Sequence, residues 1–152
     1  MLENLLLLFL ILFLCGLPIF FHAPLFKLKE IEKDYIKENG LIHFTSHKKV
    51  LLIQKEGLKG KVSHMGGIEK RLGRLIWTYP YSDEVESTHD ILINKKRGKE
   101  DCSRYNTCLR LQDFSETDLN NMYKRIGLFG DMAIVYKGEK LFPKRITIIK
   151  KW

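Results

Sequence analysis

Positive charge is missing from the start of the chain. The sequence contains 26 Lys and Arg residues, but none precedes Lys27. A removable secretory signal peptide begins with a positively charged region and ends at a cleavage site made of small residues. The chain instead offers Glu3 near its N-terminus, and the nearest cleavage candidate, residues 21–23, begins with an aromatic residue. These absences disfavour a signal peptide that is removed.

Cysteine is also scarce, with three residues in the whole chain. Structural zinc sites usually combine a pair of cysteines two to four residues apart with two further ligands. Five residues lie between Cys102 and Cys108 and no second pair exists, so we expect no metal site. Bulky Phe13 and Leu14 before Cys15 disfavour a lipoprotein acylation site. The spacing of Cys102 and Cys108 does suit a disulfide across a small loop in an oxidising compartment, and two free thiols are the alternative.

Catalytic motifs are absent from the sequence as well. It has no Gly-x-Ser-x-Gly elbow, no Walker phosphate loop and no recognisable pair of catalytic carboxylates. His43 and His47 have the spacing of zinc ligands on a helix, but the residues around them follow a strand pattern. His64 and His89 are acid-base groups of a kind that most chains of this length contain. We therefore predict no catalytic residues and no cofactor.

A long apolar segment dominates the N-terminus. Residues 5–21 include no charged or amide side chain, and the apolar character continues to Phe26 with only His22 interrupting it. A helix of about 20 apolar residues is long enough to cross a hydrocarbon core roughly 30 Å thick. The sequence therefore predicts an uncleaved transmembrane anchor at residues 1–26.

The next segment has the pattern of an amphipathic helix. Leu28, Ile31 and Tyr35 fall on one helical face, and Asn39 followed by Gly40 is a stop signal. We expect a short juxtamembrane helix within residues 27–40 that links the anchor to a folded domain.

Residues 41–152 predict one small domain dominated by strands. The segments that favour strands are 41–46, 50–53 and 75–79, with 91–94 as a further candidate. Leu75, Trp77 and Tyr79 share one strand face, which we interpret as core, with Tyr81 at its rim.

The C-terminal part adds a helix and a hairpin. Ser115 is placed as an N-cap, and the spacing of Leu119, Met122 and Ile126 predicts a helix that ends before Gly127. Residues 132–136 and 146–149 then read as two paired strands with a turn near 138–139. The expected fold class is α+β, with a mainly antiparallel sheet and one or two helices.

The net charge points to anionic partners. After residue 26 the chain has 26 basic and 17 acidic residues, a formal charge of +9, which attracts phospholipid headgroups, nucleic acid or an acidic protein. No run of five basic residues exists, so a dedicated nucleic-acid arm is not expected. One local anion site is a candidate, because positive side chains accompany exposed backbone amides in a glycine-rich stretch. Its residues are Lys59, Lys61, His64, Gly66 and Gly67.

Two features disagree about the side of the membrane. Lysines follow the apolar segment and none precedes it, which the positive-inside rule associates with a cytoplasmic domain. A disulfide between Cys102 and Cys108 would require an oxidising compartment instead. We expect an extracytoplasmic domain, periplasmic or extracellular.

The expected function is a non-catalytic protein-binding or accessory module at the membrane surface, whose partner is another protein. One alternative is a cytoplasm-facing basic domain that binds nucleic acid or anionic lipid. A second is a membrane-tethered hydrolase, which would need His64, His89 and a carboxylate to meet in one pocket.

Overall fold

The computed structural model describes residues 25–62, 72–96, 102–126 and 132–152, except for the side chains of 91–96, 102 and 103. The helices are α2 (Glu30–Asn39), α3 (Val50–Glu56), α5 (Val85–Lys96) and α6 (Glu116–Asn120), with short 3-10 helices at His47–Lys49 and Cys102–Tyr105. The strands are β1 (Phe26–Lys27), β2 (Leu41–Thr45), β3 (Leu58–Lys59), β4 (Lys61–Val62), β5 (Arg74–Pro80), β6 (Thr107–Gln112), β7 (Met122–Ile126), β8 (Met132–Lys137), β9 (Lys140–Leu141) and β10 (Arg145–Lys151).

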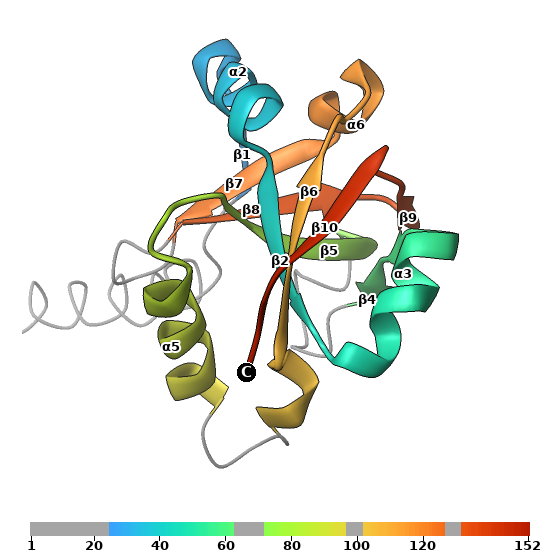
Figure 1. The fold of residues 1–152 in the computed structure, drawn as a ribbon. Helices are drawn as coiled ribbons and strands as arrows, with labels where there is room; N and C mark the ends of the chain where they lie inside the picture. Colours follow the sequence, from blue (N-terminus) through green and yellow to red (C-terminus); the bar gives the residue numbers. More distant parts are fainter. Residues whose placement is uncertain (1–24, 63–71, 97–101, 127–131) are drawn as a thin grey trace, which may run out of the picture.

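One antiparallel sheet organises the domain (Figure 1). Its strands follow the order β1-β7-β8-β5-β2-β6-β10, and β4 pairs with part of β5. Strands β3 and β9 form a separate two-stranded ribbon. The fold is therefore α+β with a mostly antiparallel sheet, as the sequence predicted.

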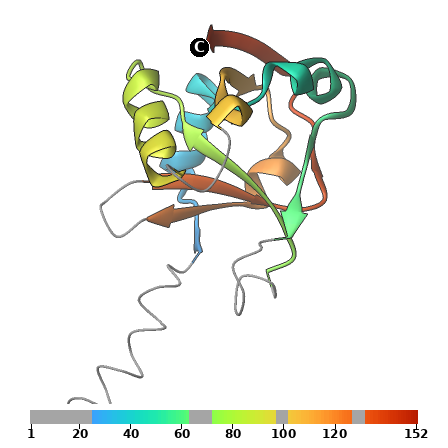
Figure 2. The ribbon, with the colours of Figure 1, turned by 90° about the horizontal axis from the view of Figure 1, so that it is seen from below.

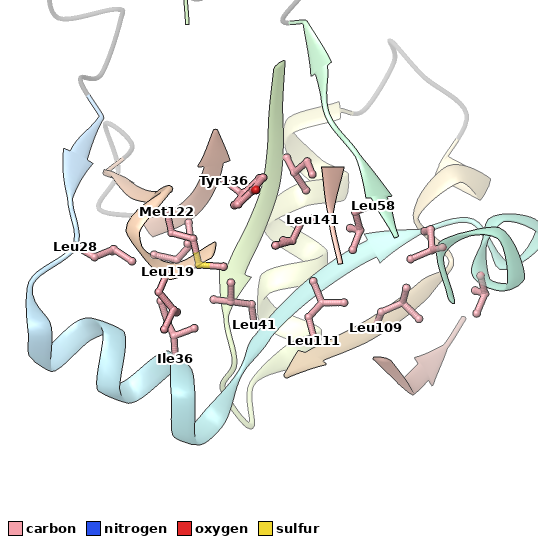
Figure 3. Packing of buried hydrophobic residues seen from close by; sticks show 14 residues of the cluster. Leu28, Ile36, Leu41, Leu58, Leu109, Leu111, Leu119, Met122, Tyr136 and Leu141 are labelled. Carbon is pink, nitrogen blue, oxygen red and sulfur yellow. The ribbon is translucent and has the colours of Figure 1, made fainter. Parts of the chain in front are cut away.

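The larger core lies on the face of the sheet that α2, α3 and α6 cover. Because side chains alternate along a strand, Leu41 of β2 and Leu109 and Leu111 of β6 point to this face. They pack with Ile36 of α2 and Leu119 of α6 (Figure 3). We call this face the α2 side.

The opposite face is covered by α5, which lies well apart from α3 in both views of the ribbon (Figures 1 and 2). Ile42, Phe44, Val85 and Cys108 are buried there, and Tyr79, Tyr81 and Tyr105 pack against them. We call this face the α5 side.

The fold class needs one correction, which concerns the transmembrane helix. Among the helices in the described ranges, none is long and apolar enough to cross a membrane. The predicted anchor falls almost wholly on residues 1–24, outside those ranges.

The helix that follows also differs from the expected linker. It forms over Glu30–Asn39, but Leu28 just before it and Ile36 within it are buried in the core of the sheet domain. The helix is therefore part of the domain, because its apolar face packs on the sheet.

Two predicted strands are helical instead. Residues 50–53 begin α3, where Val50 and Ile53 are buried and Leu51 and Leu52 are exposed, which is the spacing of a helical face. Residues 91–94 continue α5. A run of four apolar residues has no periodicity that separates a strand from a helix, which explains both errors.

The C-terminal prediction is right at its start and wrong afterwards. Ser115 caps α6 as expected, its Oγ accepting a hydrogen bond from the Asp118 amide at 3.1 Å. The helix ends at Asn120, however, and the next residues form β7, which pairs with β8 along its length. The predicted hairpin is also wrong, because β8 pairs with β5 and β7 while β10 pairs with β6.

Candidate functional site

An apolar groove of about 380 Å³ separates α2 from the ends of β5 and β8. Its lining comes from α2 and Leu28 two residues before it, from the end of β5 and the two residues after it, and from the start of β8. The lining residues are Leu28, Ile31, Glu32, Tyr35, Ile36, Pro80, Tyr81, Ser82, Met132 and Ile134. Leu28, Ile36 and Ile134 also belong to the core of the α2 side. The groove is therefore a place where that core opens to the surface.

Gly40 places α2 along the groove. Its φ of +82° ends the helix and leads directly into β2, and a Cβ at this position would lie 2.5 Å from the Leu111 carbonyl oxygen. Only glycine satisfies both conditions without strain. The Tyr81 amide donates to the Gly40 carbonyl at 3.3 Å, so the same junction also holds the wall of the groove.

Two hydrogen bonds and a cation–π contact fix that wall. Tyr35 donates its hydroxyl to the Tyr81 carbonyl oxygen at 2.6 Å, which ties α2 to the segment after β5. The Arg110 guanidinium lies 3.8 Å from the centre of the Tyr81 ring and donates through Nε to the Asn39 carbonyl at 2.8 Å. The groove is thus held open by side chains with defined partners.

The charge in the groove lining is neutralised. Lys124 Nζ lies 2.6 Å from a carboxylate oxygen of Glu32, and the Lys29 amide donates to the other oxygen at 2.7 Å. The hydrogen bond from Lys124 and then the one from Lys29 lower the pKa of Glu32 below its usual value. A ligand in the groove therefore meets a mainly apolar surface with one satisfied carboxylate.

Exposed apolar side chains surround the mouth of the groove. Cross-strand partners in a sheet point to the same face, and the register pairs Phe26 with Lys124, Lys124 with Ile134 and Ile126 with Met132. All of these residues consequently share the face that carries α2. We define the apolar rim by its members that are at least 40% exposed, namely Phe26, Ile31, Tyr35, Ile126 and Met132.

The predicted anion site is only partly described. Lys59 and Lys61 are exposed on β3 and β4, and Lys59 forms an ion pair with Glu56 at 2.7 Å. The Gly60 amide between them donates to the Glu139 carbonyl at 2.8 Å. His64, Gly66 and Gly67 lie outside the described residues, so this site stays a prediction.

The predicted disulfide also stays a prediction. Cys108 is buried on the α5 side, and this burial raises the pKa of its thiol to about 12. Cys102 begins a 3-10 helix, but its side chain is outside what the structure describes.

Two of the histidines have structural surroundings. His43 Nδ1 lies 2.9 Å from the Trp77 carbonyl oxygen, and burial lowers its pKa. The His89 ring stacks on Trp152 with 3.8 Å between ring centres, and its Nε2 lies 3.0 Å from the Tyr105 carbonyl. Across the described ranges, no group of three or more His, Cys, Asp or Glu side chains is placed to hold a metal ion.

No family model, curated protein sequence or solved structure matches this chain. The groove must therefore be interpreted from its own geometry. The groove was not predicted from the sequence, although one signal was present. Ile31 and Tyr35 make the apolar face of the helix wider than packing on the sheet requires.

Proposed function

We propose that this protein is a non-catalytic binding module at a membrane surface, and that its α2 groove binds an apolar segment of another protein. The groove itself carries the proposal. Its volume lies within the range of about 300 to 1,000 Å³ typical of ligand sites, and such sites are mostly apolar with a few placed polar groups. The lining of this groove has the same composition.

The polar groups of the groove favour binding over chemistry. Glu32 is held as a carboxylate by Lys124 and the Lys29 amide, so its pKa is shifted away from the range a general acid or base needs at neutral pH. The Tyr35 hydroxyl already donates to a backbone carbonyl. Both groups can orient a bound segment at the mouth of the groove, while the floor supplies apolar contact.

The membrane part of the proposal rests on the sequence. Residues 5–21 are uninterrupted by charged or amide side chains, and only four residues separate Phe21 from Phe26 of the apolar rim. A segment of this composition is more stable in lipid than in water. The groove then lies at the end of the domain where the chain joins that segment.

Photocrosslinking in native membranes tests the proposal. A benzophenone amino acid replaces Met132 in the groove or, as a control, Leu52 on α3, in the full chain; the two side chains are 40% and 49% exposed. We expect a discrete crosslinked product at position 132 only, which mass spectrometry maps to an apolar segment of one protein. The same product at both positions would contradict a specific groove.

A pair of charge substitutions sharpens the test. Ile31 lines the groove and is 76% exposed, while Leu51 on α3 is 79% exposed, so neither substitution with glutamate removes buried packing. Ile31→Glu should abolish the crosslink at position 132 by placing a charge in an apolar site. Leu51→Glu should leave the crosslink unchanged. A crosslink that survives Ile31→Glu would overturn the proposed site.

A further inference from the structure

Two groups of exposed apolar side chains among the described residues lie at different places on the domain. The first is the apolar rim around the groove. The second, which we call the α3 patch, consists of Leu51, Leu52 and Phe142, which are 49% to 79% exposed. In both ribbon views α3 lies at the opposite side of the domain from the end of β7 that meets the start of β8 (Figures 1 and 2). Similar side chains in different places offer an internal comparison.

The chain enters the domain at the apolar rim. Phe26 belongs to β1, and the apolar segment 5–21 ends five residue steps before it, a distance of at most about 18 Å of extended chain. Neighbouring strands are about 5 Å apart, so the ends of β7 and β8 lie within about 10 Å of β1. If segment 5–21 is in a bilayer, the rim lies close to the bilayer surface.

The charges beside the rim suit phospholipid headgroups. Lys29 is exposed at the start of α2, and Lys27 is exposed on the edge strand β1, where its side chain points to the opposite face of the sheet from Phe26. The one acidic residue of the groove lining, Glu32, is neutralised by Lys124. Apolar side chains next to lysines are the combination by which proteins lie in a membrane interface.

We propose that the apolar rim rests on the phospholipid bilayer, so that the α2 groove opens toward the membrane and receives its partner from there. This inference rests on the membrane attachment in the proposed function. It adds an orientation of the domain and identifies the partner segment as one located at or in the bilayer.

Depth-dependent quenching tests this orientation. The full chain is reconstituted into phosphatidylcholine vesicles, with a fluorescent amino acid at one position in each variant and spin-labelled lipids as quenchers. Phe26 and Ile126 are the rim positions, each 46% exposed, and Phe142 and Leu52 are the matched controls at 51% and 49%. We expect quenching at both rim positions and none at the controls.

A lysine comparison tests the role of charge. Adding phosphatidylglycerol to the vesicles should increase quenching at the rim positions. Lys27→Gln together with Lys29→Gln should reverse this increase, because each lysine removed should lower the equilibrium constant for contact between the rim and the bilayer by roughly fivefold. Lys48→Gln with Lys49→Gln, two exposed lysines of the short 3-10 helix, should have no effect. An equal effect of both pairs would show attraction by net charge alone and would overturn the oriented contact.

The result separates this inference from the proposed function. If the chain floats with vesicles but the four positions are quenched alike or not at all, the orientation is wrong and the membrane attachment stands. If the chain does not float with vesicles, the membrane attachment itself is wrong. If the rim is shielded in native membranes by a protein crosslinked at Phe26, a protein rather than lipid covers the rim.

Discussion

The two sides of the sheet are packed with different kinds of side chain. The α2 side is filled mainly by aliphatic residues from three helices and seven strands, and its core opens into the groove beneath α2. The α5 side is smaller and largely aromatic. There Phe44 lies 5.5 Å from the His89 ring and 6.1 Å from the Trp152 ring, measured between ring centres.

We interpret this difference between the two sides as a division between stability and binding. Large aromatic rings close the α5 side, whereas the helix on the α2 side spans a gap that its own side chains do not fill. A surface apolar groove is costly in water unless something else covers it. The α2 side therefore combines the main core with the groove in which we propose that another molecule binds.

The largest expected effect concerns how tightly the α5 side is closed. In a Cys15→Ser, Cys102→Ser variant, Cys108 alone should react with a maleimide. We expect labelling at pH 8 to be slower in the folded protein than in denaturant by more than about a thousandfold, because the pKa of Cys108 is raised to about 12 from about 8.5. Rapid labelling of the folded protein would show that this side is open.

The same measurement on the Cys15→Ser variant examines the predicted disulfide. In denaturant without reductant, labelling of both Cys102 and Cys108 would show two free thiols. Labelling that appears only after reduction would show that they are bonded.

The second effect distinguishes the core of the α2 side from its groove. Leu41 is fully buried, so Leu41→Ala should lower the free energy of unfolding by about 2 to 5 kcal/mol. Ile31 is 76% exposed, so Ile31→Ala should change it by less than about 0.5 kcal/mol. Urea denaturation measures both. Comparable losses would mean that the groove belongs to the core.

The smallest effect is the pH dependence of the groove. Because Lys124 and the Lys29 amide lower the pKa of Glu32 in the folded state, Glu32 stabilises the fold above its unfolded pKa of about 4.3. This contribution is lost as the pH falls through the lower folded pKa. Glu32→Gln should therefore flatten the decrease in stability below about pH 5, by at most about 1 kcal/mol.

Glu30→Gln is the matched control for that titration. Glu30 pairs with Lys33 on the same helix, but its side chain is 80% exposed and lies outside the groove lining. We expect a smaller change in the acid dependence than with Glu32→Gln. An equal change would contradict the assignment of the effect to the groove.

Local patterns in the sequence predicted the elements that local patterns determine. The strand alternation of β2 and the β-forming residues of β5 identified both strands, and the serine before α6 identified its cap. The sequence-based predictions fail where one pattern of residues fits two different structures. Leu119, Met122 and Ile126 have helical spacing, yet pairing with β8 makes the residues from Met122 onward a strand.

Long-range arrangement was not accessible from the sequence. The groove needs α2 to meet the end of β5 and the start of β8, and no local signal announces which strands become neighbours. The pairing of β10 with β6 is equally non-local and excluded the expected hairpin. The apolar residues on α2 were visible, but the other wall of their site was not.

The position of β10 also has a consequence for biosynthesis. This strand is the last element of the sheet, and its partner β6 is made more than thirty residues earlier. Because a ribosome makes the chain from its N-terminus, β6 emerges before β10, and the edge of β6 that pairs with β10 stays unpaired until β10 has been made. Throughout that interval the apolar segment 5–21 is already outside the ribosome, so contact with a membrane or a chaperone begins before the domain can finish folding.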